Sequence, residues 1–176
     1  MKIKWAATII LFLSILISCS VSEKQQHFID KIDSIETVFD SVSNQYILLD
    51  TVKIFNSFDL INTNLLRLSD IDTVLSDTVK IYAFMQKSFK RLISEHRAIS
   101  EEISFSKKQL LTLKNDIRKD IISDERIEKY YFEEKEAIDN LMYKIRFNVQ
   151  SIEYQLQSFD HLNEKMETII DKYEKQ

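Results

Sequence analysis

The stretch that decides the fold is residues 127–173, IEKYYFEEKEAIDNLMYKIRFNVQSIEYQLQSFDHLNEKMETIIDKY. Large apolar residues recur in it mostly every three or four positions, which is the spacing of one face of an α-helix. They are Ile127, Tyr131, Ile138, Leu141, Ile145, Val149, Ile152, Leu156, Phe159, Leu162, Met166, Ile170 and Tyr173. A stripe of this length predicts one continuous amphipathic helix.

The same spacing occurs twice earlier in the sequence. One stripe alternates steps of four and three, as a coiled-coil seam does, and then continues less regularly. It comprises Phe28, Ile32, Ile35, Phe39, Val42, Tyr46 and Leu49, then Phe58, Ile61, Leu65, Leu68 and Ile71. The other comprises Leu75, Val79, Tyr82, Met85, Phe89, Leu92, His96, Ile99, Ile103, Leu110, Leu113, Ile117 and Ile121. Three helical arms are therefore predicted.

Residues with helix-capping chemistry separate the arms. Ser22 and Gln25 have the spacing of a capping box at the start of the first arm. Serine and aspartate between residues 69 and 77 predict a turn at about 70–76. A second turn is predicted at residues 122–125, with Ser123 as the N-cap of the last arm. The three arms are then each about 50 residues long.

Two weaker signals leave the number of helices open. Residues 55–58, Phe-Asn-Ser-Phe, are poor helix formers and predict a bend or a short break in the first arm. Residues 100–102, Ser-Glu-Glu, can cap a new helix and predict a kink in the second arm. A break at either place would divide three arms into four or five helices.

Composition supports an all-α fold. The 176 residues include no glycine and no proline, which tight turns in β-rich folds normally use. Hydrophobic residues make up 44% and charged residues 30% of the chain, which suits long amphipathic helices. We therefore predict an elongated antiparallel up-down-up bundle, or coiled coil, of three long helices, or four if one is broken. Each arm would be roughly 75 Å long.

The N-terminal segment has the features of an export signal. Lys2 and Lys4 form a positive region, and residues 6–17 are an uncharged run rich in isoleucine and leucine. This run is shorter than the ~20 residues that a membrane-spanning helix needs. Small Ser18 precedes Cys19, the only cysteine in the chain.

Leu16-Ile17-Ser18-Cys19 resembles the lipobox of bacterial lipoproteins. The resemblance implies that residues 1–18 are a signal peptide that is removed, and that residues 19–176 are a single helical domain. It also implies that Cys19 carries a thioether-linked diacylglycerol and usually an N-acyl chain. Two or three acyl chains make a stable membrane anchor. A membrane partner, reached through the Cys19 lipid, follows from this resemblance.

The pattern as a whole is similar to small helical lipoproteins of Gram-negative bacteria, particularly the Bacteroidota type. In that family, a residue other than Asp after the lipidated cysteine implies the outer membrane, and Ser20 fits. Residues 20–24 lack the acidic run of surface-exported members, so the resemblance favours the periplasmic face over the cell surface. The chain ends in Gln176, not in the lysine of members that are linked to the cell wall.

Residues typical of catalysis or metal binding are not arranged as such sites require. None of His27, His96 and His161 has a carboxylate three residues before it, and no His-x-x-x-His pair occurs. His96 lies on an apolar stripe and is predicted to be a core histidine with a hydrogen-bond partner, whereas the other two are predicted at the surface. The carboxylates at 133–136 are interpreted as a solvated helix face. We expect no enzyme activity, metal or cofactor.

Charge is distributed unevenly between the arms. The first arm is acidic, whereas residues 87–119 are basic and include Lys107, Lys108, Lys114, Arg118 and Lys119. An up-down-up bundle would bring these five residues back towards the membrane, where each could gain ~1 kcal/mol from anionic headgroups. The alternative is that they balance the acidic first arm. A net charge of -4 argues against a nucleic-acid partner.

These inferences predict a membrane-anchored lipoprotein whose bundle is a protein-interaction or spacer module in the cell envelope. Its partner would be another envelope protein or a second copy. Apolar residues left outside the seam, such as Phe58, Phe84 and Phe105, are candidate contacts, and residues 130–132 are a second aromatic candidate. The alternative is a binding protein for a small or lipidic ligand held between the helices, which requires a pocket lined by large apolar residues.

Overall fold

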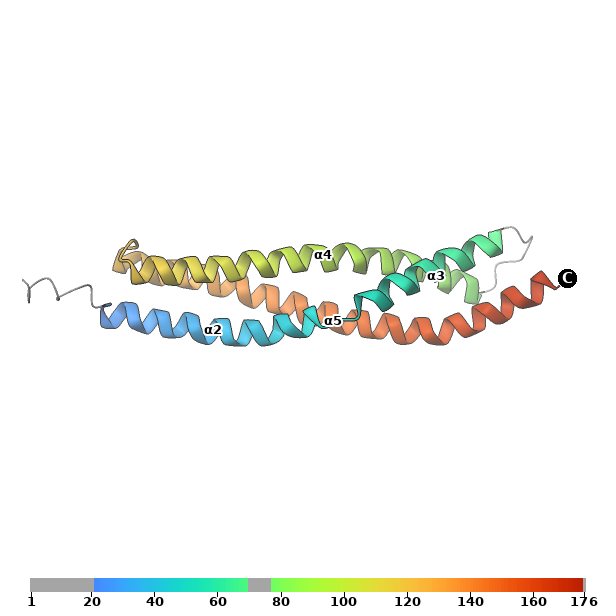
Figure 1. Ribbon diagram of the computed structural model, residues 1–176, viewed down its shortest axis with the longest axis horizontal. Helices are drawn as coiled ribbons and strands as arrows, with labels where there is room; N and C mark the ends of the chain where they lie inside the picture. The colour runs from blue at the N-terminus through green and yellow to red at the C-terminus, as the bar shows by residue number, and fades with distance from the viewer. Residues whose placement is uncertain (1–20, 70–76, 176) are drawn as a thin grey trace, which may run out of the picture.

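The computed structural model describes residues 21–69 and 77–175. These residues form four helices and no strand, so the all-α prediction is confirmed (Figure 1). The helices are α2 (Glu23–Ile47), α3 (Thr51–Ser69), α4 (Asp77–Arg118) and α5 (Asp124–Glu174). The predicted turn at 70–76 and the predicted signal peptide lie outside the described residues.

The helices form an elongated rod with up-down-up topology. In Figure 1, α2 and α3 follow one another along the rod in the same direction, α4 runs back beside both, and α5 runs forward again. The 51 residues of α5 correspond to about 75 Å of helix. The predicted antiparallel bundle is confirmed, in the form with the first arm broken into two helices.

The break in the first arm lies earlier than predicted. It falls at residues 48–50, whereas residues 55–58 lie inside α3. The Asp50 carboxylate accepts a hydrogen bond from the backbone N–H of Lys53 at 2.8 Å and so caps the start of α3. Poor helix formers at 55–58 are tolerated because Ile54 and Ser57 are buried against the other arms.

No new helix begins at residues 100–102, because α4 continues through them. The Ser100 hydroxyl donates to the His96 carbonyl at 2.9 Å, so it bonds back along the same helix instead of capping a new one. The N-terminal capping box is confirmed. The Ser22 Oγ accepts from the Gln25 N–H at 3.1 Å, and the Gln25 side chain accepts from the Ser22 N–H at 2.8 Å.

The bundle interior divides into two clusters along the rod, which define its two halves. The proximal half contains α2 with the C-terminal part of α4 and the N-terminal part of α5, and the distal half contains α3 with the remaining parts of α4 and α5. The proximal core includes Phe28, Ile32, Phe39, Ile103, Leu110, Ile117, Ile138 and Ile145. The distal core includes Ile54, Ile61, Tyr82, Met85, Phe89, Phe159, Met166 and Ile170.

The predicted stripes supply almost all of this core. Most of their described members are buried, and Ile35, Leu49, Phe58, Leu65, Val149, Leu156 and Leu162 are half-buried against one of the clusters. Ile121 is the clear error, since 66% of its surface is exposed. It lies after the end of α4, so the three- and four-residue spacing of a helix no longer determines which way its side chain points. Ile71 and Leu75 lie outside the described residues.

A tight turn joins α4 to α5. Asp120 has a positive φ of 54°, the left-handed conformation that usually falls to glycine after a helix. The Ile121 N–H bonds to the Asp116 carbonyl at 2.9 Å and the Asp120 N–H to the Ile117 carbonyl at 3.1 Å. An aspartate fits here because its carboxylate accepts a hydrogen bond from the Gln25 side chain at 2.8 Å. Ser123 occupies the N-cap position of α5, as predicted, but its side chain forms no capping hydrogen bond with a described residue.

Candidate functional site

The predicted lipid attachment site lies outside the described residues. Leu16, Ile17, Ser18 and Cys19 belong to residues 1–20, whose structure is not described. The first described helix, α2, begins at Glu23, four residues after Cys19. The beginning of the bundle is therefore close in sequence to the predicted anchor.

The α4–α5 turn lies at the same end of the rod as the beginning of α2. The Lys24 ammonium donates to the Asp124 carbonyl at 2.7 Å, and the Gln25 side chain contacts Asp120. This arrangement meets the geometric requirement of the headgroup hypothesis, because the C-terminal end of α4 returns to the end where the chain enters the bundle (Figure 1).

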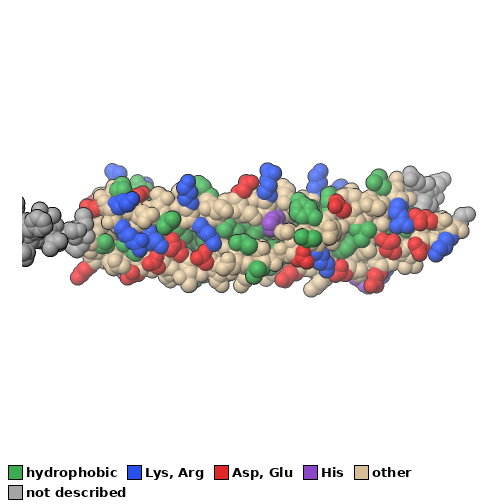
Figure 2. Space-filling model, in the orientation of Figure 1, with side chains coloured by type: hydrophobic (Ala, Val, Ile, Leu, Met, Phe, Trp, Pro, Cys, Tyr) green, Lys and Arg blue, Asp and Glu red, His purple; other side chains and the backbone are tan. Residues whose placement is uncertain are grey.

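The five basic residues predicted to contact headgroups separate into two groups. Lys107 pairs with Asp40 of α2 at 2.6 Å, and Lys114 pairs with Asp33 at 2.8 Å and with Glu36. These two lysines balance the acidic first arm, which was the alternative. Lys108, Arg118 and Lys119 are exposed and form no ion pair with any described residue. On the face in Figure 2, charges of both signs are interspersed along the rod.

Among the described residues, Lys114 is the most deeply buried charged side chain. Burial lowers the pKa of its ammonium group, but the hydrogen bonds and negative charges of Asp33 and Glu36 more than offset this, so the pKa is raised overall. The side chain is only 11% exposed, so it holds α2 against α4 and is not available to a membrane. Its sequence neighbourhood suggested a surface cation, which shows that charge alone does not place a residue.

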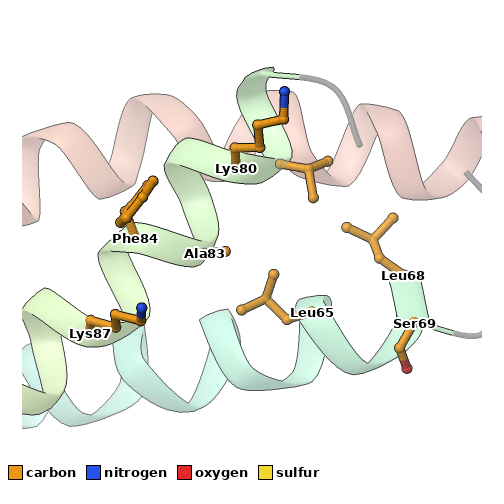
Figure 3. A pocket seen from close by; sticks show the side chains of 8 residues that line it. Leu65, Leu68, Ser69, Lys80, Ala83, Phe84 and Lys87 are labelled. Carbon is orange, nitrogen blue, oxygen red and sulfur yellow. The ribbon is translucent and has the colours of Figure 1, made fainter. Parts of the chain in front are cut away.

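A pocket lies between α3 and α4 in the distal half (Figure 3). Its cavity volume is about 380 Å³, near the lower end of the range for small-molecule sites. Figure 3 shows Leu65 and Leu68 of α3 pointing towards α4, with Lys80 and Lys87 of α4 at the edge. The remaining lining residues are Ser69, Val79, Ala83 and Phe84. The wall is thus largely apolar, with two cations beside it.

The two pocket lysines have weak interactions within the chain. Lys80 pairs with Asp77 at 3.2 Å, and both side chains are more than half exposed. Such a surface pair contributes little and exchanges readily. The Lys87 ammonium lies 5.8 Å from the centre of the Phe84 ring, which is 67% exposed. Neither ammonium group is therefore held by a strong partner within the described chain.

A polar layer crosses the distal core beside this pocket. The fully buried Asn64 amide donates to Glu167 at 2.9 Å, and to Asn163 and the Tyr82 hydroxyl at 3.2 Å each. Tyr82 donates to Asn163 at 2.7 Å. Burial is the main cause of the raised pKa of Tyr82. These buried polar groups form hydrogen bonds with one another, and they come from α3, α4 and α5. The layer therefore fixes how the three helices align.

A second polar group lies where the two halves meet. The buried Tyr46 hydroxyl donates to Asn148 at 3.3 Å, and the Asn148 amide donates to Glu95 at 2.9 Å. Burial, together with the negative charge of Glu95, raises the pKa of Tyr46. His96 stacks on Tyr46, with ring centres 5.0 Å apart and planes 17° apart. Burial lowers the pKa of His96, which favours the neutral ring.

The histidine predictions are partly confirmed. His27 and His161 are exposed, as predicted. His96 is half-buried on the inner side, but among the described residues its ring has a stacking partner and no hydrogen-bond partner. The ring stacks on the flat face of Tyr46, a contact that periodicity cannot reveal. Within residues 21–69 and 77–175, no group of three potential metal ligands is close enough to hold an ion.

The outer face of α5 carries a feature that sequence reasoning missed. Tyr143, Phe147 and Tyr154 are 74%, 62% and 68% exposed, on the side of α5 opposite its buried seam. With the exposed amides between and beside them, they form what we call the outer stripe: Asn140, Tyr143, Phe147, Gln150, Tyr154 and Gln157. No member is charged. The sequence contains a signal for it: a second set of residues spaced by three and four positions, on the side of the helix opposite the buried seam.

Two of the three apolar residues predicted as contacts are exposed. Phe84 and Phe105 are exposed, at 67% and 62%, as predicted. Phe58 is half-buried against the distal core, so the prediction that it lies outside the seam is wrong. In the aromatic cluster at 130–132, Tyr131 packs in the proximal core, and Phe132 is 53% exposed. Among the described residues, exposed aromatic side chains are therefore distributed over several faces, and three of them are aligned along α5.

Comparison of the chain with protein-family models, with curated proteins and with solved structures finds no match. Among the helices of the described residues, none combines the length and the apolar character needed to cross a membrane.

Proposed function

We propose that this chain is an exported lipoprotein, held through Cys19 at the periplasmic face of the outer membrane, whose helical rod is a protein-interaction or spacer module. The observation that carries the interaction role is the outer stripe of α5. Protein interfaces have centres that are depleted in charge and enriched in aromatic residues, and the outer stripe has both properties. Three exposed aromatic side chains on a single helix face are also unusual for a solvated surface.

The shape of the rod supports the spacer role. The bundle begins four residues after Cys19, so almost no tether separates the proposed anchor from the folded part. The midpoint of the outer stripe is roughly 35 Å along α5 from the end at which α2 begins. A lipidated rod that stands on the membrane would hold the outer stripe at about this height.

The interaction role is tested by photo-crosslinking in intact cells. A benzophenone amino acid replaces Phe147 in the full-length chain, and Phe105 in a matched control with the same exposed fraction of 62%. We expect a discrete cross-linked product at position 147 and several-fold less product at position 105. Equal products at both positions, or none at either, would contradict a specific binding face on α5.

The anchor is tested separately by mass spectrometry of the membrane-extracted protein. We expect a chain that begins at Cys19, carries diacylglycerol and lacks Trp5, the only tryptophan. A Cys19→Ala variant should accumulate with its N-terminal segment attached. An unmodified wild-type chain that begins at Met1 would refute the lipoprotein part of the proposal without affecting the interaction part.

Headgroup contact is proposed only for the basic residues that have no ion pair. Lys108, Arg118 and Lys119 are exposed near the end where α2 begins, and Arg118 and Lys119 are the nearest to it. We expect their replacement by Gln to weaken binding of the full-length chain to anionic liposomes. The Lys107→Gln variant should bind as the wild type does, because Lys107 is paired with Asp40. Equal loss in both variants would contradict the assignment.

A second candidate function is the binding of an amphipathic ligand in the pocket between α3 and α4. The apolar wall would hold an acyl chain, and Lys80 and Lys87 would meet its anionic group. We expect palmitate to raise the unfolding temperature of the full-length chain in nanodiscs. The double variant Lys80→Gln/Lys87→Gln should lose this shift, and Lys108→Gln/Lys119→Gln should keep it. A shift of equal size in every variant would point to non-specific binding.

A further inference from the structure

The outer stripe of α5 has the same spacing in both directions. Its steps are three, four, three, four and three, so a second copy laid antiparallel across it keeps the same register. The twofold axis then passes between Phe147 and Gln150. Tyr143 faces Tyr154 of the second copy, Phe147 faces Gln150, and Asn140 faces Gln157. Aromatic residues thus meet aromatic residues or an amide, and amides meet amides.

We propose that the chain forms a twofold dimer with a second copy of itself through the outer stripe, with the two α5 helices antiparallel. This inference rests on the proposed interaction function and names its partner. Twofold dimers use the same patch on both subunits, so such a patch must be complementary to itself. The outer stripe meets that condition along its whole length.

The charges that flank the outer stripe favour the antiparallel orientation. Arg146 and Glu153 lie on the same side of it, both are exposed, and neither forms an ion pair with a described residue. In the antiparallel register, Arg146 of each copy lies beside Glu153 of the other, which gives two identical ion pairs. A parallel pair would instead place Arg146 opposite Ser151 and Glu153 opposite Ser158. The unpaired charges are therefore matched only in the antiparallel dimer.

The next flanking positions do not oppose this arrangement. They bring Asp139 near Asp160 of the second copy, which would repel if both charges were uncompensated. Asp139, however, is paired with Lys135, and Asp160 is paired with Lys53 at 2.8 Å. On the other side of the outer stripe, Lys144 is paired with Glu102 of α4 and would face Ser151. Each of these five charges, Arg146, Glu153, Asp139, Asp160 and Lys144, thus has a partner, either within its own chain or in the second copy.

The size of the contact predicts a weak dimer that the membrane strengthens. From their exposed fractions, the three aromatic side chains of one copy expose on the order of 400 Å². A standard stable interface buries about 800 Å² on each partner. The amides reduce this difference without removing it. Confinement of anchored chains to one surface raises their effective concentration, which compensates for a weak contact.

The antiparallel dimer has a consequence for the anchors. The twofold axis lies close to the middle of α5, so the two rods overlap along almost their whole length. The two proximal ends, which are close in sequence to Cys19, would then lie at opposite ends of the dimer, about 75 Å apart. Because both chains are anchored to the same membrane surface, such a dimer lies along that bilayer. It therefore fits the interaction role of the proposed function and not the upright spacer role.

Cysteine cross-linking in membranes tests the dimer and its orientation. The full-length chain carries Tyr143→Cys with Tyr154→Cys, while Cys19 is blocked by its lipid. In the antiparallel dimer these two positions face each other, so oxidation should give a disulfide-linked dimer, and peptide mapping should identify the 143–154 link. Tyr143→Cys alone should give at least five-fold less dimer, because the two copies of residue 143 are then about 16 Å apart along the helices.

Two controls support the assignment. Wild-type protein should give no dimer, which confirms that Cys19 is not reactive. Phe105→Cys should also give none, because it is equally exposed but lies on α4. A dimer with Tyr143→Cys alone that equals the double variant would mean parallel chains and would overturn the proposed orientation. No dimer with any variant would overturn self-association.

A charge exchange tests the flanking pairs. In the double-cysteine background, Arg146→Glu should lower the dimer yield several-fold, because two like charges would then face each other on each side of the axis. Combining Arg146→Glu with Glu153→Arg should restore the yield. Loss without restoration would contradict the proposed pairing.

The photo-crosslinking experiment at Phe147 separates this inference from the function on which it rests. A product with twice the mass of the chain supports both. A product with a different protein, together with no disulfide dimer, would leave the interaction function standing and refute self-association.

Discussion

The two halves of the rod are built from the same helices α4 and α5, but they are held together differently. In the proximal half, Lys107 and Lys114 of α4 form ion pairs with carboxylates of α2, and the end is fastened by Lys24 and Gln25. In the distal half, a polar layer around Asn64 lies within the core, and a pocket opens between α3 and α4.

This difference indicates how the molecule divides its tasks. The proximal half is fastened from outside its core, close to the predicted anchor. The distal half also has exposed ion pairs between α3 and α5, of Lys53 with Asp160 and of Arg67 with Glu174. What distinguishes it is the layer of buried hydrogen bonds around Asn64, which favours one arrangement of helices over others. The outer stripe of α5 spans the boundary between the halves. The helix that both halves share therefore carries the proposed contact.

The largest expected effects come from the two cores. Phe39 in the proximal half and Phe89 in the distal half are both fully buried, so changing either to Ala should cost about 3–5 kcal/mol of the free energy of unfolding. Urea unfolding followed by circular dichroism measures this loss. In hydrogen exchange, Phe39→Ala should deprotect α2 most and Phe89→Ala should deprotect α3 most. Equal deprotection throughout would show that the halves unfold as one unit.

The cross-helix ion pairs should differ between the halves. Lys114→Met removes a buried ammonium group that pairs with the partly exposed Asp33 and Glu36 carboxylates, which should cost about 1–2 kcal/mol. In the distal half, Lys53→Met removes a largely exposed pair with Asp160 and should cost less than about 1 kcal/mol. Equal losses on urea unfolding would contradict this distinction.

The Lys114 interaction also predicts a pH dependence. Because the pKa of Lys114 is raised above its ordinary value of 10.5 in the folded chain, its stabilising effect is complete below that value. The effect should disappear as pH rises through the raised pKa. The stability difference between wild type and Lys114→Met should therefore be constant near pH 8 and shrink above about pH 10.5. A difference that grew with rising pH would refute the assigned pairing.

Buried polar groups should have opposite effects in the two halves. Asn64→Ala in the distal half leaves Glu167 and Tyr82 with fewer partners and should cost about 1–2 kcal/mol. The Ser43 hydroxyl in the proximal half is buried and has no partner among the described residues. Ser43→Ala should leave stability unchanged or raise it by up to about 1 kcal/mol. A destabilising Ser43→Ala change would indicate an undetected hydrogen bond.

The smallest expected effects come from the helix caps. Ser22→Ala removes the capping box of α2, and Asp50→Ala removes the cap of α3, so each should cost about 1 kcal/mol. Hydrogen exchange distinguishes the two variants, because it should increase in the first turn of α2 for Ser22→Ala and in the first turn of α3 for Asp50→Ala. An Asp50→Ala variant with unchanged exchange in α3 would mean that the break at 48–50 is set by packing alone.

Much of the fold could be predicted because its signals are local. The spacing of Phe28 to Leu49 and of Ile127 to Tyr173 records which helix face is buried, and the chain folds accordingly. The break in the first arm could not be placed correctly, because it depends on a competition. The weak helix propensity at 55–58 acts against core contacts of Ile54 and Ser57, and the contacts prevail.

The candidate sites were less predictable. The pocket requires two segments, 65–69 and 79–87, to meet at a particular distance, and no single stretch of sequence encodes that distance. In the sequence, Lys107 and Lys114 have surroundings similar to those of Lys108 and Lys119. Only the position of the α2 carboxylates decides which lysines are paired and which are exposed. The outer stripe, by contrast, was present in the spacing of Tyr143, Phe147 and Tyr154.

The sequence by itself determined the helices, their up-down-up order and most of the residues that face the interior. These properties follow from spacing, capping and the absence of glycine and proline, which act over a few residues at a time. The tertiary structure decided which charges are paired, where the first arm breaks and where a pocket forms. The pairing of charges depends on side chains about 80–100 positions apart, as for Lys114 with Asp33 and Lys24 with Asp124. The pocket depends on the distance between residues 65–69 and 79–87. These properties become fixed only when the arms pack together.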